Sequence, residues 1–286
     1  MVTGDIGNLS NKQKFTEDFT PFENCNLLIG ECTYGDSKRT TTSKDREKDL
    51  EKIKATIETI CKDRKGRILI PAFSFGRSPS MLATLYDLYH DDESFDIPII
   101  YASPLGVKLM DIYSKELNED QREYFNKVLS WSRIKLLNNF EDLAREVADN
   151  KPKIFVCPSG MMQAGYSVYV GTQLLPHSND CIMFCGYSSE GSLSWKIKQK
   201  KTKTISIDGK NIHARCQVVN LVSFSSHAQQ PDLLRIYSEV EADKIALVHG
   251  NFDAKVNFCT QLQKQLSKSN KTSKVICVNK STVISL

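Results

Sequence analysis

The sequence contains no long apolar run and no export signal. No stretch approaches the roughly 18 consecutive apolar residues of a membrane-spanning helix, so we expect no membrane partner. The first thirty residues lack a basic segment followed by an apolar one, which argues against export. We therefore expect a cytoplasmic protein.

Cysteine is present but is not arranged for cross-linking. The nine cysteines are an odd number, they are scattered along the chain, and no C-x-x-C spacing occurs. This pattern does not support a zinc ribbon and argues against a disulfide framework. We expect reduced, mostly buried thiols.

A strong excess of one charge is also missing. The net charge of +4 permits nucleic-acid binding but does not predict it, because basic footprints are usually stronger. The glycine-containing segments SGMMQAG and GYSSEGS could turn backbone N–H groups toward an anion. They match neither the phosphate-loop nor the dinucleotide fingerprint, so we expect no nucleotide cofactor.

The 286 residues can form a full core and two lobes, since domains cluster at ~100–150 residues. Apolar runs typical of buried strands alternate with segments of helical spacing, for example 50–60 and 78–88. Ser78 is predicted to cap the second of these helices, with Pro79 at its first position. Repeated strand–turn–helix units predict an α/β fold with a mostly parallel sheet and helices on both faces. The predicted buried strands are 26–29, 67–72, 99–101, 154–156 and 182–184.

The pattern changes after about Thr204. Two β segments are predicted around a turn at 208–210. The elements predicted after them are a helix (231–239), a strand (244–248), a helix (254–267) and a final β pair (274–278 and 282–286).

Two carboxylates near the start are candidates for chemistry. Asp5 lies between Gly4 and Gly7, and glycines allow the sharp turn that holds a carboxylate in an open cleft. An Asx turn is the ordinary alternative. Glu31 directly follows the apolar run LLIG, at the sheet edge where sites form, and could orient a histidine. Its alternative is a helix-capping or loop glutamate.

Two histidines near the end are further candidates. His227, after Ser225-Ser226, could donate a proton because imidazole titrates near neutrality. His249 ends the strand KIALV before a glycine, which suits a metal ligand. Each could instead be a hydrogen-bonded structural histidine. The other three histidines lie in polar contexts and are predicted to be surface residues.

Arg77 in SFGRS could contact a phosphate at the turn before its helix. A salt-bridging structural arginine is the alternative.

The order of these segments resembles the β-CASP branch of the metallo-β-lactamase superfamily, which contains nucleic-acid-processing metallo-hydrolases. The matching segments run through nearly the whole chain: TGDIG, LLIGECTYG, ILIPAFSFGR, ASPLG, SGMMQAG, GYSSEGSL, FSSHAQQ and LVHG. The family patterns behind three of them are E-S/A-T-Y-G, I-P-A-F-x-x-G-R and S-A-H-A-D.

The resemblance implies a role for each candidate residue. Asp5 would bridge two zinc ions, and His249 would complete the coordination of one of them. His227 would act as general acid with its ring held by Glu31, and a hydroxide activated by the two metals would attack the phosphorus. Relatives with a histidine at the last motif resemble RNA-cleaving enzymes, whereas DNA-directed relatives tend to carry valine, so His249 favours RNA.

The sequence departs from the family pattern in two ways. The H-x-H-x-D-H signature, which lies upstream of the aspartate motif, is absent, and only four residues precede Asp5. Two zinc ions need about three or four protein ligands each, so the chain alone is expected to bind zinc poorly and to be inactive. Gln229 replaces the aspartate of S-A-H-A-D, which removes a carboxylate that supports the local structure.

The resemblance implies a partial metallo-β-lactamase αββα sandwich (1–35 and 204–286) with an inserted β-CASP lobe (36–203). The expected function is zinc-dependent RNA hydrolysis, with RNA as substrate and a missing N-terminal half or complementing chain as partner. A non-catalytic RNA-processing scaffold is the alternative, and a small-molecule thioester or lactam hydrolase is the weaker third class. A sheet edge left exposed would favour a homo-oligomer.

Overall fold

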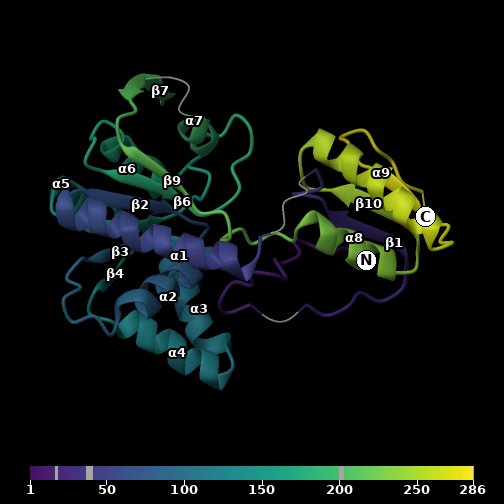
Figure 1. Ribbon diagram of the computed structural model, residues 1–286, viewed down its shortest axis with the longest axis horizontal. Coiled ribbons are helices and arrows are strands. Elements are labelled where there is room, and N and C mark those ends of the chain that lie inside the picture. Colours follow the sequence, from purple (N-terminus) through teal and green to yellow (C-terminus); the bar gives the residue numbers. More distant parts are fainter. Residues whose placement is uncertain (17–18, 37–40, 200–202, 286) are drawn as a thin grey trace. The chain divides into compact units, whose positions relative to one another are not determined.

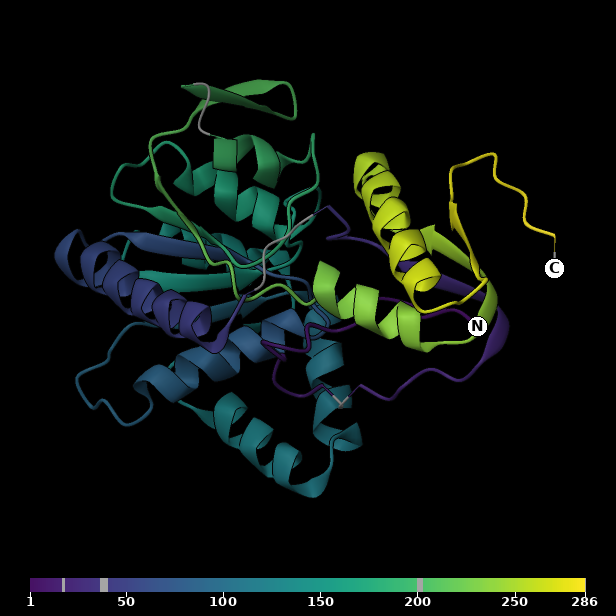
Figure 2. The same cartoon turned by 45° about the vertical axis from the view of Figure 1, so that its right-hand side comes forward.

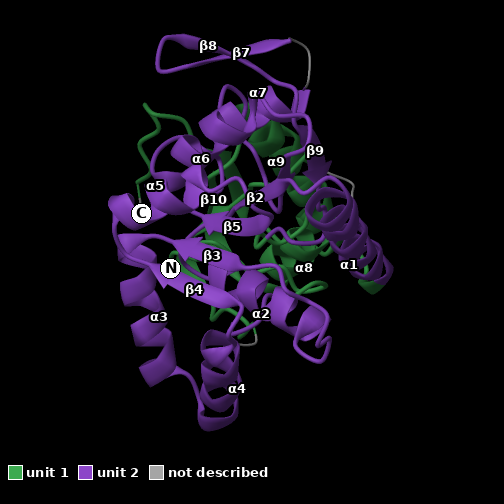
Figure 3. Cartoon of the chain, turned by 90° about the vertical axis from the view of Figure 1, so that its left-hand side faces the viewer, with its two compact units in different colours: residues 1–12, 17–43, 226–286 green, residues 13–16, 44–225 purple. Residues whose placement is uncertain are grey.

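The computed structural model describes residues 1–16, 19–36, 41–199 and 203–285. The chain divides into two compact units, coloured separately in Figure 3. Unit 1 contains residues 1–12, 17–43 and 226–286, and unit 2 contains residues 13–16 and 44–225.

Unit 2 is built on a six-stranded sheet in the order β4-β3-β5-β2-β6-β9, and all of its strand pairs are parallel (Figure 1). A fully parallel sheet is buried on both faces, so its strands are nearly continuous apolar runs. The strands are β2 (Arg67–Pro71), β3 (Ile99–Ala102), β4 (Ile134–Leu137), β5 (Lys153–Cys157), β6 (Cys181–Phe184) and β9 (Gln217–Asn220).

Helices cover both faces of this sheet because successive strand residues point to opposite sides. Ile68 and Ile70 of β2 pack with the first group of helices, whereas Leu69 between them packs with the second. The first group is α1 (Ser43–Ile57) with its π-helical extension η1 (Glu58–Asp63), α2 (Arg77–Tyr89), α3 (Pro104–Glu116) and α4 (Glu119–Ser130). The second is α5 (Phe140–Ala148), α6 (Tyr166–Leu174) and α7 (Leu193–Gln199).

A separate hairpin joins β7 (Thr204–Ile207) to β8 (Lys210–His213). Its two turn residues both have positive φ, 48° at Asp208 and 75° at Gly209. A two-residue hairpin turn of type I′ needs positive φ at both positions, and Asp-Gly is a favoured pair there. The predicted turn at 208–210 is thereby confirmed.

Unit 1 contains a three-stranded parallel sheet in the order β1-β10-β11. Its elements are β1 (Cys25–Glu31), β10 (Ala242–Val248), β11 (Lys274–Cys277), α8 (Gln230–Glu239) and α9 (Phe252–Lys268). The two helices lie beside the sheet in both views (Figures 1 and 2). Leu28, Ile245 and Val275 form one row across the three strands and pack in the same core as Tyr237 and Phe258 of the helices.

The opposite face of this sheet is less covered. Ile29, Ala246 and Ile276 share a row there, and both Ile29 and Ile276 are only half-buried. An amphipathic sheet normally buries its apolar face against a second layer. The described residues therefore leave the apolar side chains of this row partly exposed.

The α/β class with mostly parallel sheets flanked by helices is confirmed, but two local predictions are wrong. Helix α2 begins at Arg77 with Gly76 as its N-cap, and the Ser78 hydroxyl instead donates to the carbonyl of Phe73 at 2.8 Å. The predicted strand 282–286 does not form over residues 282–285, and residue 286 lies outside the described part. Val283 is 94% exposed, so the alternating pattern there has no face to bury.

The boundaries between the units differ from the predicted ranges 36–203 and 204–286. The change of unit occurs between residues 225 and 226, because β9 pairs with β6 and the segment after the hairpin therefore belongs to the unit 2 sheet.

The remaining side-chain predictions concern cysteine and histidine. All nine cysteines are free, and six of them are buried. His90, His177 and His213 are exposed, as predicted. Among the described helices, none is long and apolar enough to cross a membrane.

Candidate functional site

The carboxyl ends of two neighbouring parallel strands place Glu31 and His249 together. Glu31, the last residue of β1, lies opposite Val248, the last residue of β10, and His249 follows immediately. Ligands in open α/β sheets bind at this end of the strands. The register of one strand pair therefore explains how residues more than 200 positions apart meet.

A second pairing adds Asp5 and His227. The N–H of Ala228 donates to the carbonyl of Ile6 at 2.8 Å, and the N–H of Asn8 donates to the carbonyl of Ser226 at 3.1 Å. These bonds form an antiparallel bridge between Gly7 and His227. They hold the Asp5 segment beside the turn that carries His227.

The four side chains form one cluster within unit 1. One ligand atom from each of Asp5, Glu31, His227 and His249 lies within 4.8 Å of the others. The imidazole rings of His227 and His249 are stacked, with centroids 5.3 Å apart. All four predicted acid and histidine residues are thus brought together.

Burial divides the cluster into an inner and an outer pair. The side chains of Glu31 and His227 are 1% and 14% exposed, whereas those of His249 and Asp5 are 53% and 62% exposed. The inner pair is bonded directly, with His227 Nδ1 at 3.0 Å from Glu31 Oε2. The outer pair is open to a ligand from solvent, and His249 Nδ1 lies 3.8 Å from Asp5 Oδ1.

Glu31 is the most constrained member. Its Oε1 accepts the backbone N–H of Ile6 at 2.6 Å, and its Oε2 accepts the hydroxyl of Thr33 at 2.6 Å in addition to the bond with His227. A buried carboxylate is stable only when such bonds satisfy it. These three hydrogen bonds differ from those of a helix-capping or loop glutamate, which was the alternative interpretation of Glu31.

The backbone segments at Cys32 and at His249-Gly250 are held close together. The N–H of Cys32 donates to the carbonyl of His249 at 2.9 Å. Gly250 has φ of 134°, and a Cβ at this position would lie 2.4 Å from the Cys32 carbonyl oxygen. Only glycine at position 250 allows this segment to approach the backbone of Cys32 so closely. Burial, with Glu31 nearby, raises the pKa of the Cys32 thiol to about 12, so this thiol is not a reactive group of the site.

Sequence reasoning missed Thr33. Its hydroxyl oxygen lies 2.8 Å from His249 Nδ1 and 3.3 Å from His227 Nδ1, besides its bond to Glu31. Its position in the turn two residues after Glu31 was the one signal that the sequence offered.

Gln229, which stands where the family pattern has an aspartate, makes hydrogen bonds of its own. Its amide oxygen accepts the N–H of Thr41 at 2.6 Å, and its amide nitrogen donates to the Thr41 hydroxyl at 2.8 Å. Asn11 donates to the same hydroxyl at 3.0 Å. The amide thus joins the segment after His227 to the residues before α1.

Arg77 lies in unit 2 and is only 3% exposed. Its guanidinium carbon lies 5.1 Å from the centre of the Phe73 ring. A Cβ on Gly186 would lie 2.3 Å from its Nη1, so the guanidinium packs directly against that glycine. The structure therefore places Arg77 in a packed environment.

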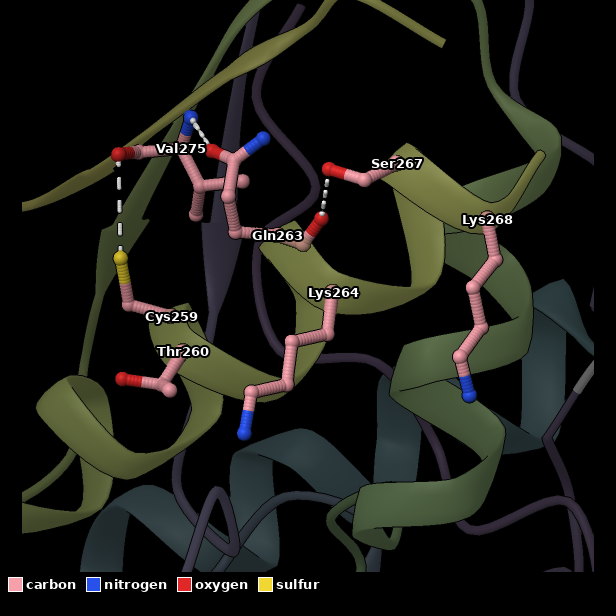
Figure 4. A pocket seen from close by; sticks show the side chains of 7 residues that line it. All are labelled: Cys259, Thr260, Gln263, Lys264, Ser267, Lys268 and Val275. Atoms are coloured by element: carbon pink, nitrogen blue, oxygen red, sulfur yellow. Dashed lines mark hydrogen bonds between the residues drawn. The ribbon is translucent and has the colours of Figure 1, made fainter. Parts of the chain in front are cut away.

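An open groove on unit 1 is a separate feature from this cluster. Its volume is about 640 Å³, and α9 and β11 line it (Figure 4). The lining residues are Cys259, Thr260, Gln263, Lys264, Ser267, Lys268 and Val275. None of the four clustered side chains lines this groove.

Which chemistry the cluster supports follows from its donor set. Imidazole nitrogens and carboxylate oxygens are the ligands that zinc accepts, and a histidine bonded to a carboxylate is the usual arrangement of an oriented imidazole. Asp5 and His249 are the exposed donors, so they fit a metal, whereas His227 and Glu31 form an oriented pair beside them.

Two family models match the chain. The Beta-Casp domain matches residues 80–197. The Zn-dependent metallo-hydrolase RNA specificity domain matches residues 211–273, which include His227 and His249. The chain belongs to the β-CASP family of the metallo-β-lactamase superfamily. The predicted family is thereby confirmed.

Curated relatives of this family are similar over most of the chain. Endoribonuclease YSH1 from Mycosarcoma maydis is 29% identical over 254 residues, covering 87% of this chain and 28% of its own length. Transcription termination factor FttA from Methanococcus maripaludis is 29% identical, covering 87% and 41%. Cleavage and polyadenylation specificity factor subunit 3 from Dictyostelium discoideum is 26% identical, covering 96% and 34%. The chain thus spans well under half the length of each relative.

Proposed function

We propose that this chain supplies part of the active site of a zinc-dependent ribonuclease that hydrolyses RNA phosphodiester bonds. The observation that supports the proposal is the convergence of Asp5, Glu31, His227 and His249 within 4.8 Å at the strand ends of unit 1. The similarity to an endoribonuclease supports RNA as the substrate class.

Asp5 and His249 are the proposed metal ligands. Their side chains are the exposed ones of the cluster, and they offer a carboxylate oxygen and an imidazole nitrogen. When bound, two zinc ions supply an activated water nucleophile and offset the negative charge that develops on the phosphoryl oxygens.

His227 is the proposed general acid. Its Nδ1 is held by the Glu31 carboxylate at 3.0 Å, so Nε2 is the nitrogen that can pass a proton to the leaving oxygen.

The ligand count requires additional donors. Two zinc ions take about three or four protein ligands each, and Asp5 and His249 are two residues. We propose that the remaining ligands come from an N-terminal half or a complementing chain, and that this chain alone is inactive. The half-buried apolar row of Ile29 and Ile276 supports a further layer on that face of the sheet.

We also propose that Arg77 contributes to binding of a substrate phosphate. Its permanent charge and planar guanidinium suit a phosphate, although the side chain is only 3% exposed.

A non-catalytic RNA-processing scaffold is the second candidate. The observation that favours it is the shortage of metal ligands within the described residues. A scaffold would bind RNA or partner proteins and would not cleave RNA under any condition of reassembly.

The two functions can be separated by reconstitution. The chain is mixed with zinc, a labelled single-stranded RNA and a fragment of a relative that carries the H-x-H-x-D-H signature. We expect zinc-dependent cleavage by the mixture, and loss of cleavage with Asp5→Asn or His249→Ala. Verified reassembly without cleavage, or cleavage that survives both substitutions, would count against the ribonuclease.

A further inference from the structure

The hydroxyl of Thr33 lies at the centre of the cluster and touches three of its side-chain groups. Its oxygen is 2.6 Å from Glu31 Oε2, 2.8 Å from His249 Nδ1 and 3.3 Å from His227 Nδ1. Thr33 is 4% exposed, so these contacts are shielded from water. A buried hydroxyl with several polar neighbours must distribute one proton and two lone pairs among them.

The proton of Thr33 can be assigned by elimination. A carboxylate accepts hydrogen bonds and cannot donate one, so the 2.6 Å contact with Glu31 uses the hydroxyl proton. The oxygen of Thr33 must then accept at the 2.8 Å contact with His249. His249 therefore carries a proton on Nδ1, and its lone pair is on Nε2.

The same reasoning applies to His227. Its Nδ1 lies 3.0 Å from Glu31 Oε2, which accepts, so this nitrogen also carries a proton. One buried carboxylate thus orients both rings, His227 directly and His249 through the hydroxyl of Thr33.

Asp5 does not provide an equivalent contact. Its Oδ1 is 3.8 Å from His249 Nδ1, beyond hydrogen-bond distance. The carboxylate charge favours a proton on Nδ1, but Thr33 is the group that bonds it.

We propose that Thr33 is a positioning residue that holds His249 in the Nδ1–H tautomer and thereby presents Nε2 to a metal ion. The proposal that Nε2 binds a metal rests on the proposed function, whereas the tautomer does not. Ligating histidines commonly donate their second ring N–H to an oxygen that fixes the ring. Here the oxygen belongs to a hydroxyl that is itself polarised by Glu31.

The tautomer can be measured directly in the metal-free chain. The histidines are labelled with ¹⁵N, and long-range ¹H–¹⁵N spectra are recorded at alkaline pH, where imidazole is neutral. We expect His249 in the Nδ1–H form, although free neutral imidazole side chains prefer the Nε2–H form. Finding wild-type His249 in the Nε2–H form would overturn the proposal without any variant.

Three variants isolate the hydroxyl. Thr33→Val keeps the shape and removes the hydroxyl, so His249 should shift toward the Nε2–H form. Thr33→Ser keeps the hydroxyl and should retain the wild-type tautomer. Asp5→Asn, which removes the nearby charge, should also retain it. An unchanged tautomer in folded Thr33→Val, or a tautomer that shifts only in Asp5→Asn, would contradict the role of Thr33.

A zinc titration separates this proposal from the proposed function when each variant is first reassembled with the fragment that carries the H-x-H-x-D-H signature. Loss of a bonded partner behind a ligating histidine typically weakens metal binding about 10–100-fold, so Thr33→Val should bind zinc at least about tenfold more weakly than Thr33→Ser. Equal affinities in the two variants would show that the tautomer does not serve a metal. Equal zinc affinity of the reassembled wild type and the reassembled His249→Gln variant, together with the predicted tautomer, would refute the metal site and leave the role of Thr33 intact.

Discussion

Substitution of Glu31 by glutamine should destabilise unit 1 while barely changing the size of the side chain. The carboxylate accepts three hydrogen bonds, from Ile6 N–H, the Thr33 hydroxyl and His227 Nδ1, and it is 1% exposed. Glutamine has one oxygen. If that oxygen keeps the bond to Ile6, an NH₂ group faces the hydroxyl and the imidazole N–H.

The magnitude follows from the bonds that are lost. Hydrogen bonds to a charged group contribute about 1.5–3 kcal/mol each. The bonds from Thr33 and His227 lose their acceptor, and part of the loss is recovered if His227 changes tautomer and accepts from the new amide. We therefore expect Glu31→Gln to lower the free energy of unfolding of unit 1 by about 2–4 kcal/mol.

The assay must report on unit 1. Both tryptophans, Trp131 and Trp195, lie in unit 2, so their fluorescence follows the other unit. The imidazole NMR signals of His227 and His249, recorded during urea denaturation, follow unit 1 itself.

Glu239→Gln is the matched control in the same unit. Its carboxylate is 59% exposed and lies 3.5 Å from Arg235, an arrangement that typically contributes about 0–1 kcal/mol. A loss in Glu31→Gln no larger than in this control would refute the hydrogen-bond assignment at Glu31.

Three further predictions concern stability and RNA binding. Gly30→Ala should lower the melting temperature, because its Cβ would lie 2.4 Å from the Tyr237 hydroxyl oxygen; an unchanged melting temperature would contradict this packing. Burial lowers the pKa of Lys198 from 10.5 to about 8, so the unfolded chain keeps this proton longer as pH rises. Between pH of about 8 and 10.5, the free energy of unfolding of the wild type should therefore rise with pH relative to that of Lys198→Met. The variant Lys196→Met should keep the pH dependence of the wild type. Arg77→Met should weaken RNA binding and reduce the salt slope by about 1 compared with Arg77→Lys, and equal slopes would exclude a phosphate contact.

The sequence predicts the site well where a strand ends at a functional residue. Glu31 and His249 each follow an apolar run, and parallel pairing then brings their strand ends together. The position of Asp5 depends on a pairing between residues 6–8 and 226–228 that no local pattern indicates. The flanking glycines made Asp5 a candidate, and the family resemblance predicted that it lies beside His249.

Prediction from the sequence fails where tertiary contacts determine the local structure. Ser78 is a residue type that favours helix caps, yet its hydroxyl donates to the Phe73 carbonyl, and the helix begins at Arg77, two residues before the predicted first position. Thr33 resembles any threonine at the end of a strand, and only the distances to three partners show its place in the cluster. The alternation of 282–286 suggests a strand, but Val283 finds no surface to pack against.

The most direct test of the central proposal is the zinc affinity of the chain and of three single variants, each reassembled with the fragment that carries the H-x-H-x-D-H signature and measured by competition with a chromogenic chelator. The affected variants are Asp5→Asn and His249→Gln. His213→Gln is the control, because His213 is exposed and lies in unit 2. We predict about tenfold or greater weakening for the first two variants and no change for the control. Equal zinc affinity in all four proteins would contradict the assignment of Asp5 and His249 as metal ligands.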